Sequence, residues 1–538
     1  MERAAETRSE GEKERGRIAG RAGIVGLGTL ASRLLGLLRD QVIAAVFGRA
    51  VTDAFFVAFL IPNVLRQLLA EGAVQNAILP VLSEVRERDG DAAAQRFFRA
   101  VRGLSLTLLV IVTALGVAFA PELVTLFAAG YRQEPGQFEL TVLLTRWVFP
   151  YILFMGTAAL GIAALNTYQR FVASSFAPGL LNVAFVVVSL VLPGWLGARG
   201  YEPGLALAVA ALLGGVLQVV AQWPSLRRIG FLQAPSFELG HPGVRSVLKR
   251  MAPMLFGIGV YYVDVVLARR FLSELGTGAQ SYFGWALRLC DFPQGIFVMA
   301  LSTAALPSLS RFSARGDFAE LGRTFAFGMK LALFVAVPAS ALVVALAEPI
   351  VMLLFQRGAF DAESTRETGR ALIAQGLGIW AVAGVRQLLS VYYAVGNTRA
   401  PVVVAALDLA VFVLLALVLR GPFGHVGIGY AVTGAAVAQF AMLWWGLGAH
   451  LPSRHLADVS GSAARVLGAS LIGGLLAALT VRALGLGPDS NPALRLLPGV
   501  LGTLVFLVAF VIAAALFRSP ELRSFRNLVQ KKLGRRAR

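Results

Sequence analysis

The sequence contains little of what enzymes and secreted proteins commonly depend on. Its 538 residues include one cysteine, Cys290, which excludes an intramolecular disulfide and a cysteine-rich metal site. The four histidines lack the HExxH spacing of zinc hydrolases, so we expect no metal enzyme. Residues 1–20 carry a mixed-charge run but no apolar stretch. They are therefore predicted to be a disordered cytoplasmic extension rather than a cleavable signal peptide.

Charged residues are also scarce, while apolar residues are abundant. Only 15% of the residues are charged, 57% are hydrophobic, and the mean hydropathy is +0.71. A soluble core could not bury this much apolar surface. Apolar runs of about 20 residues, each able to cross a hydrocarbon layer roughly 30 Å thick, begin near residues 22, 52, 103, 141, 175, 203, 250, 280, 326, 371, 400, 426, 463 and 494. The sequence predicts an all-α polytopic membrane protein with about 14 transmembrane helices and no separate soluble domain.

The net charge of +19 is distributed unevenly. Lys and Arg are concentrated in the first 21 residues, in segments 84–102, 226–250 and 311–330, and from residue 518 onward. Except for three arginines between residues 356 and 370, the loops predicted on the opposite side carry almost none. The positive-inside rule therefore predicts that both termini are cytoplasmic. No basic face is interleaved with aromatic residues, so we expect contact with anionic membrane lipids and no binding of nucleic acid.

The chain contains an internal repeat. Residues 76–84 reappear as residues 303–311, and residues 121–127 as residues 349–355, at offsets of 227 and 228. An Asn-Thr pair followed by Ala-Pro occurs at residue 166 and again at residue 397. These matches predict two six-helix lobes, over residues 21–225 and 246–449. An even number of spans gives both lobes the same orientation, the parallel-repeat arrangement of some transporters. An additional helix pair is predicted in residues 460–518, followed by a basic cytoplasmic tail, residues 519–538.

Ionisable residues lie within the first two predicted spans. Arg33 and Asp40 are seven residues apart, which places them within about 20° on one helical face, and Arg39 lies about 100° from Asp40. In the second span Pro62 is expected to bend the helix one turn before Arg66. Other residues predicted to support or gate this site are Ser32, Gly36, Asp53 and Glu71.

The second half carries fewer such residues. Arg288 precedes Asp291 by three residues, and Arg386 lies within the tenth predicted span. A charge at membrane depth costs at least ~2.5 kcal/mol, so these groups indicate a polar cavity or a transport path. Guanidinium groups suit bidentate binding of phosphate, so a diphosphate is the natural ligand. The alternative is pairing within the bundle, such as Arg39 with Asp40 or Arg288 with Asp291.

Several segments resemble a known family. They are Ser32 to Asp40, Thr52 to Phe59, Pro62 to Arg66, Glu71 to Ala73, Pro80 to Glu84, Phe149 to Tyr151, Leu165 to Thr167, Phe176 to Pro178 and Arg288 to Pro293. In this order they closely resemble the MurJ/MviN lipid II flippases of the multidrug/oligosaccharidyl-lipid/polysaccharide exporter superfamily. The resemblance covers roughly residues 20 to 520, and the N-terminal block is its most specific part.

The resemblance implies a transporter of the bacterial inner membrane. Such a protein moves lipid II, the undecaprenyl-diphosphate-linked peptidoglycan precursor, to the outer leaflet by alternating access and serves cell wall biogenesis. The resemblance also implies that Arg33, Arg39, Arg66 and Arg288 line the central cavity, with Asp40 beside them. The spans after residue 460 would form a groove for the lipid tail. We expect the protein to act as a monomer.

The resemblance also raises the question of a sodium ion, although no other cofactor is expected. Some relatives bind sodium through an acidic residue on the seventh span and groups on the eleventh and twelfth. Asp264 fits the first position, and Asp408 and Thr433 are candidates for the others. The paired Asn/Asp pattern of the family is absent from the eleventh span. Local hydrogen bonds, or pairing of Asp264 and Asp408 with Arg386, are the alternative.

Other functions remain open. An exporter of another polyprenyl-linked oligosaccharide would also need cavity arginines, whereas a cation-coupled drug exporter of the same superfamily would not need so many. A membrane scaffold or a polyprenyl-phosphate transferase could also hold a diphosphate. A transferase should show clustered carboxylates for a metal or a nucleophile and its base, and we find neither pattern in the sequence.

Overall fold

The computed structural model consists of helices and their connections. It describes residue 28 and residues 30–67, 73–238, 240–294, 299–448, 451 and 454–523. Within these ranges there is no β-strand, which confirms the predicted all-α class. The predicted extension over residues 1–20, Glu71 and most of the basic tail lie outside the described residues.

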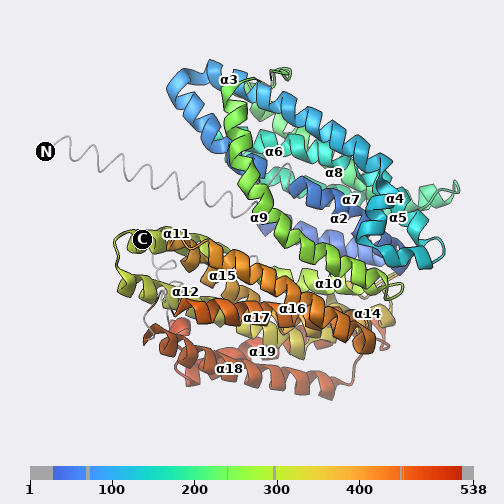
Figure 1. Ribbon diagram of the computed structural model, residues 1–538. Helices are drawn as coiled ribbons and strands as arrows, with labels where there is room; N and C mark the ends of the chain where they lie inside the picture. Colours follow the sequence, from blue (N-terminus) through green and yellow to red (C-terminus); the bar gives the residue numbers. More distant parts are fainter. Residues whose placement is uncertain are drawn as a thin grey trace, which may run out of the picture. The chain divides into compact units, whose positions relative to one another are not determined.

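The chain divides into two compact units, residues 1–262 and residues 263–538. The first unit begins with helical residues 30–46. It continues with α2 (Arg49–Arg66), α3 (Ala73–Ala118), α4 (Ala120–Phe127), the 3-10 helix η2 (Ala129–Gln133), α5 (Gln137–Val148), α6 (Tyr151–Thr167), α7 (Phe171–Gly197) and α8 (Leu205–Arg228). The following helix, α9 (Pro242–Ser273), crosses the boundary between the units (Figure 1).

The second unit contains the remaining helices. They are α10 (Ala279–Pro293), α11 (Met299–Ala314), α12 (Phe318–Ala345), α13 (Ala347–Phe355), α14 (Ala362–Gly376), α15 (Ile379–Ala394), α16 (Arg399–Phe423), α17 (His425–Leu447), α18 (Arg454–Leu484), the 3-10 helix η4 (Pro492–Leu494) and α19 (Leu496–Leu516). A buried apolar cluster joins α12, α15 and α17 to the pair α18 and α19. The last two helices are therefore an integral part of this unit.

The internal repeat is visible in the order of the helices. α4 corresponds to α13, α5 to α14, α6 to α15, α7 to α16 and α8 to α17. Gly90 interrupts α3 with a φ of 83°, and Gly316, which separates α11 from α12, has a φ of 68°. Positive φ values favour glycine because it lacks a Cβ atom. A glycine with positive φ thus occurs at matching places in both halves.

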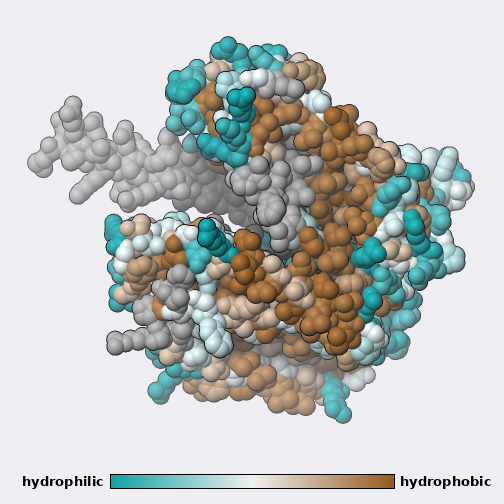
Figure 2. All heavy atoms as spheres, viewed as in Figure 1, coloured by the Kyte–Doolittle hydropathy of each residue, from teal (hydrophilic) through white to brown (hydrophobic). Residues whose placement is uncertain are grey.

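Ten helices in the described part of the chain are long and apolar enough to cross a membrane. This confirms a polytopic membrane protein, whereas the predicted number of 14 spans is not confirmed. The four other predicted spans coincide with helical residues 30–46, α2, α9 and α10. Hydrophobic residues cover broad areas of the surface, and hydrophilic residues gather mainly where helices end (Figure 2).

Candidate functional site

Helical residues 30–46 pack closely against α7 in the first unit. A Cβ atom at Gly28 would lie 2.8 Å from the carbonyl oxygen of Ser175, and one at Gly36 would lie 3.8 Å from Nδ2 of Asn182. Residue numbers rise together along the contact, from Gly28 to Gly36 and from Ser175 to Asn182, so the two helices run parallel. Small residues allow such close approach between membrane helices. This contact positions the first group of predicted site residues.

Arg39 and Asp40 form a buried ion pair within this contact. Nε and Nη2 of Arg39 donate to Oδ1 of Asp40 at 2.9 and 2.7 Å, and Nη1 donates to Oδ1 of Asn182 at 3.0 Å. The two charged side chains are only 13% and 10% exposed. Nδ2 of Asn182 in turn donates to the carbonyl oxygen of Ser32 at 2.9 Å. The alternative of an ion pair within the bundle is therefore realised for Arg39, whose guanidinium is held in a fixed orientation.

Arg33 faces a different environment. It lines an open cavity of about 560 Å³ between helical residues 30–46, α6 and α7. The polar residues around this cavity are Ser32, Arg33, Asn166, Ser174 and Ser175, and the others are apolar. All of them belong to the first unit. Among the described residues, the cavity is lined by one cation with hydroxyl and amide groups and by no carboxylate, which suits an anion that also carries neutral polar groups.

Helix α2 carries the next predicted residues. Asp53 is fully buried, and Pro62 lies inside the helix. Arg66 donates from Nε and Nη2 to Oδ1 of Asn63 at 3.0 and 2.8 Å. Asn63 is neutral, so this contact orients Arg66 without cancelling its charge. Glu71, which follows on the same predicted span, lies outside the described residues.

In the second unit, Arg288 and Asp291 are both exposed near the end of α10. Arg386 is half-buried in α15. Within the part of the chain that the structure describes, we find no hydrogen bond or ion pair made by its guanidinium, and it does not pair with Asp264 or Asp408. The relation of these arginines to those of the first unit stays a prediction.

The two carboxylates of the predicted sodium site lie on neighbouring helices. The rings of Phe271 on α9 and Phe412 on α16 are 6.4 Å apart between centroids. Nearby, Asp264 and Asp408 are close enough to interact electrostatically. Oδ1 of each is buried and has no hydrogen-bond partner among the residues that the structure describes. Local hydrogen bonds, the alternative to a sodium site, are thus not found for these two atoms.

Thr433 is not brought to these carboxylates. Its hydroxyl donates to the carbonyl oxygen of Ala374 at 2.6 Å. A Cβ atom at Gly434 would lie 2.5 Å from Leu415, so this part of α17 is level with Leu415. Asp408 lies seven residues earlier on α16, roughly 10 Å along the helix axis. The described residues also contain no group of three or more His, Cys, Asp or Glu side chains suited to a metal. Asp264 and Asp408 are thus brought together while Thr433 bonds elsewhere, and binding of sodium stays a prediction.

The helices α18 and α19 form an apolar groove. It has a volume of about 520 Å³ and is lined only by Ala, Val, Ile, Leu and Phe side chains of the two helices, among them Leu476, Val508 and Ala509. A groove of this composition can hold a hydrocarbon chain but offers nothing to a charged group.

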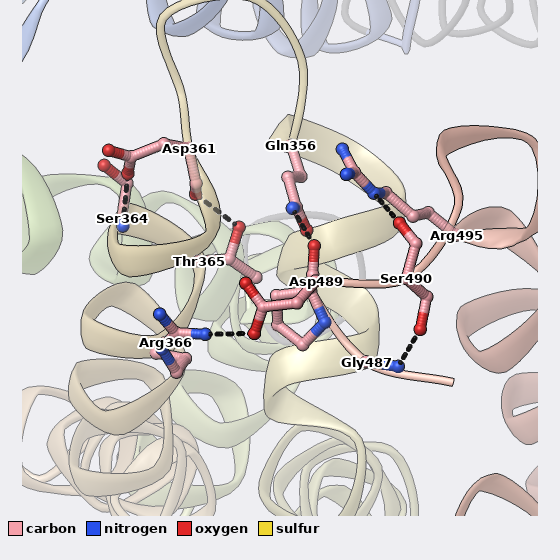
Figure 3. A network of polar contacts seen from close by, with 10 residues as sticks. Gln356, Asp361, Ser364, Thr365, Arg366, Gly487, Asp489, Ser490 and Arg495 are labelled. Carbon is pink, nitrogen blue, oxygen red and sulfur yellow. Dashed lines mark hydrogen bonds and ion pairs between the residues drawn. The ribbon is translucent and has the colours of Figure 1, made fainter. Parts of the chain in front are cut away.

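A network of polar contacts ties the loop between α18 and α19 to the loop after α13 (Figure 3). Nε2 of Gln356 donates to the carbonyl oxygen of Pro488 at 2.6 Å. Nη1 of Arg366 donates to Asp489 at 2.8 Å. Ser490 accepts a hydrogen bond from Arg495 through its carbonyl oxygen at 2.9 Å and from the amide of Gly487 through its hydroxyl at 2.9 Å. The groove is thereby fixed to the rest of the second unit.

The comparison with protein families agrees with this architecture. The family described as "Lipid II flippase MurJ" matches residues 43–487, most of the chain. The chain belongs to the lipid II flippase MurJ family. It is therefore a transporter rather than an enzyme, a multi-pass protein of the inner membrane with a role in peptidoglycan biosynthesis.

Curated members of the MurJ family are similar to the chain over most of its length. The lipid II flippase MurJ of Burkholderia cenocepacia is 35% identical over 424 residues, which cover 78% of this chain and 81% of that protein. A probable lipid II flippase MurJ of Vibrio cholerae is 34% identical over 433 residues, 79% of this chain and 82% of that protein.

Solved structures show the same fold. A structure described as lipid II flippase MurJ in an inward closed conformation has a TM-score of 0.71 at 22% identity and covers 91% of this chain and 98% of its own. An inward-facing multidrug resistance MATE family transporter has a TM-score of 0.64 at 15% identity, covering 79% and 95%. The chain thus has the same fold as these two transporters.

Sequence reasoning missed the amide side chains that hold the predicted arginines. Asn182 orients Arg39, and Asn63 orients Arg66. Each asparagine lies in a largely apolar segment. A polar residue in such a segment could have indicated a hydrogen bond to another side chain of the bundle. The pairing partner could not be read from it, because Asn182 is 143 residues from Arg39 in the sequence.

Proposed function

We propose that this protein moves lipid II from the cytoplasmic to the outer leaflet of the bacterial inner membrane by alternating access of a central site. The observation that carries the proposal is the cavity beside Arg33, in which one cation and several neutral polar groups meet within an apolar helix bundle. A polar headgroup cannot cross hydrocarbon unaided, since every unsatisfied polar group costs several kcal/mol there.

Arg33, Arg39, Arg66 and Arg288 bind the diphosphate in this proposal. A guanidinium offers planar, bidentate hydrogen bonds to phosphate oxygens, and a lysine ammonium does not. Asp40 keeps Arg39 in place. Asp53, Pro62, Glu71 and Arg386 support or gate the cavity. Relative movement of the two lobes predicted over residues 21–225 and 246–449 would expose the site to each side in turn.

The groove between α18 and α19 holds the undecaprenyl tail while the headgroup passes. Its apolar lining and its attachment to the second unit support this role. The protein acts as a monomer with both termini in the cytoplasm, in accord with the positive-inside distribution of Lys and Arg. A sodium ion held by Asp264 and Asp408 stays a separate prediction, and the proposed transport of lipid II does not depend on it.

Replacement of the essential flippase in a depletion strain tests this function. The wild-type gene should restore growth and lipid II should reach the outer leaflet, as measured by its accessibility to an external enzyme. Arg66→Ala should insert at the normal level but fail to restore growth, and Arg66→Lys should do so only in part. If purified wild-type protein in vesicles exported a drug and left lipid II in place, the protein would instead be a drug exporter.

A further inference from the structure

The cavity beside Arg33 has a second polar wall that the arginine motif does not explain. Asn166 belongs to the last turn of α6, and Ser174 and Ser175 belong to the first turns of α7. The hydroxyl of Ser174, which is only 8% exposed, donates to Oδ1 of Asn166 at 2.8 Å. All three residues line the cavity together with Arg33. Two helix ends therefore meet to present amide and hydroxyl groups to one space.

The bond from Ser174 leaves the other side of Asn166 available to a ligand. The acceptor Oδ1 is held by Ser174, so the two N–H donors of Nδ2 keep a fixed orientation. Among the described residues we find no protein hydrogen bond from this amide or from the hydroxyl of Ser175. Neither group is sealed from its surroundings, since neither belongs to the buried atoms that lack a partner. Both groups can therefore bind a ligand in the cavity.

The composition of the wall indicates the class of ligand. A bare diphosphate would be matched by several cations, but this cavity sets one guanidinium beside neutral groups that donate and accept. Neutral hydroxyl and amide groups pair well with the hydroxyl and acetamido groups of a sugar. The apolar remainder, Ile162, Phe171 and Pro178, offers a surface for the face of a sugar ring. The volume of about 560 Å³ lies in the usual range of small-ligand sites.

We propose that Asn166 and Ser175 bind the sugar attached to the lipid diphosphate, and that Ser174 is a positioning residue that orients Asn166. Arg33 contacts the adjoining phosphate. This inference rests on the proposed function and adds to it a site for the carbohydrate. A site built to hydrogen-bond a polar group rejects an analogue that lacks it, because its own groups are then left unpaired. These residues therefore select lipids that carry the sugar.

Binding to the full-length detergent-solubilised protein tests the inference with two probes, undecaprenyl diphosphate and the same lipid carrying the disaccharide. Asn166→Leu should weaken binding of the sugar-bearing lipid about tenfold, the effect of one or two lost hydrogen bonds, and leave the sugar-free lipid within about twofold. Arg33→Ala should weaken both. Ser174→Ala should weaken binding of the sugar-bearing lipid less than Asn166→Leu does. Ser174→Thr should keep wild-type binding because it keeps the hydroxyl.

Ser189→Ala is the matched control. Ser189 is a fully buried serine of the same helix and does not line the cavity, and its hydroxyl has no hydrogen-bond partner in the described part of the chain. Should Asn166→Leu fail to fold, Ser175→Ala removes a single hydroxyl and should show the same selectivity for the sugar-bearing lipid. Equal weakening of both probes, or no change in either, would overturn the inference while the proposed function stands. A wild-type protein that bound neither probe would refute the proposed function as well.

Discussion

Arg39 places two of its nitrogen atoms on a single oxygen of Asp40, at 2.9 and 2.7 Å, although the residues are neighbours in one helix. Neighbouring positions on a helix point about 100° apart. The long Arg39 side chain therefore curves back to reach its partner, and its third nitrogen is left for Asn182. The contacts with Asp40 and Asn182 together fix the Arg39 guanidinium in one orientation.

Removing one member of this pair should harm folding more than removing both. Asp40→Leu leaves the buried Arg39 charge unpaired, which typically costs about 3–5 kcal/mol, whereas apolar replacement of both partners is often neutral. The melting temperature in detergent should fall for Asp40→Leu and recover in the double variant Arg39→Leu/Asp40→Leu. Lipid II flipping in vesicles should be lost in both. A double variant that flips lipid II at the wild-type rate would show that Arg39 serves structure alone.

Arg288 and Asp291 can be tested by the same single and double replacements, but here we expect the binding of lipid II to change rather than the stability. Both are exposed, so neither single replacement should lower the melting temperature much. The double variant Arg288→Leu/Asp291→Leu should insert normally but bind lipid II at least about tenfold more weakly, since a charge-assisted contact is worth roughly 1.5–3 kcal/mol. Isothermal titration calorimetry of lipid II with the purified variants measures this affinity. Wild-type affinity in the double variant would exclude Arg288 from the site.

Filling the groove should affect long lipids selectively. Ala509→Trp places a large side chain among the apolar residues of α18 and α19, so it should slow the flipping of undecaprenyl-linked lipid II. An analogue with a short prenyl chain should be flipped at the wild-type rate. Ala406→Trp is the control, because Ala406 is an exposed alanine of α16. Equal slowing of both lipids would mean that the tail does not occupy the groove.

The contacts that anchor the helix pair should differ in strength. The Arg366 and Asp489 side chains are 43% and 77% exposed, and such an ion pair contributes about 0–1 kcal/mol. Gln356 is buried, and loss of its hydrogen bond leaves the carbonyl of Pro488 unpaired, at about 1–3 kcal/mol. Gln356→Leu should therefore speed hydrogen exchange in α19 more than Arg366→Ala does. Faster exchange in Arg366→Ala would make the ion pair the main anchor.

The fold class was readable from the sequence because each property involved is local or periodic. Apolar runs of membrane length predict helices. The matches around Pro80 and Pro307 predict a repeat, and glycines with positive φ lie at matching places, Gly90 and Gly316. The pattern of arginines likewise predicts that the site includes helical residues 30–46 and α2.

The partners of the site residues were not readable, because they depend on how helices pack. Asn182 reaches Arg39 only since Gly28 and Gly36 let two helices approach closely. The family resemblance made Asp408 and Thr433 candidates for one site. The packing of Gly434 against Leu415 sets the register of α17 along α16, and Thr433 bonds Ala374 instead. The sizes of the side chains at such contacts decide how one helix is aligned along its neighbour, and no local sequence pattern predicts this alignment.

The boundary between the two units lies inside α9. Tyr262 and Val263 belong to different units but to one continuous helix, so a cut there would break about four backbone hydrogen bonds that cross it. The connector before α9 is itself bound to α3, where the amide of Ser236 donates to the carbonyl oxygen of Arg99 at 2.9 Å. A gene fragment that ends at residue 262 therefore carries only part of α9, and the rest of that helix stays with the other half.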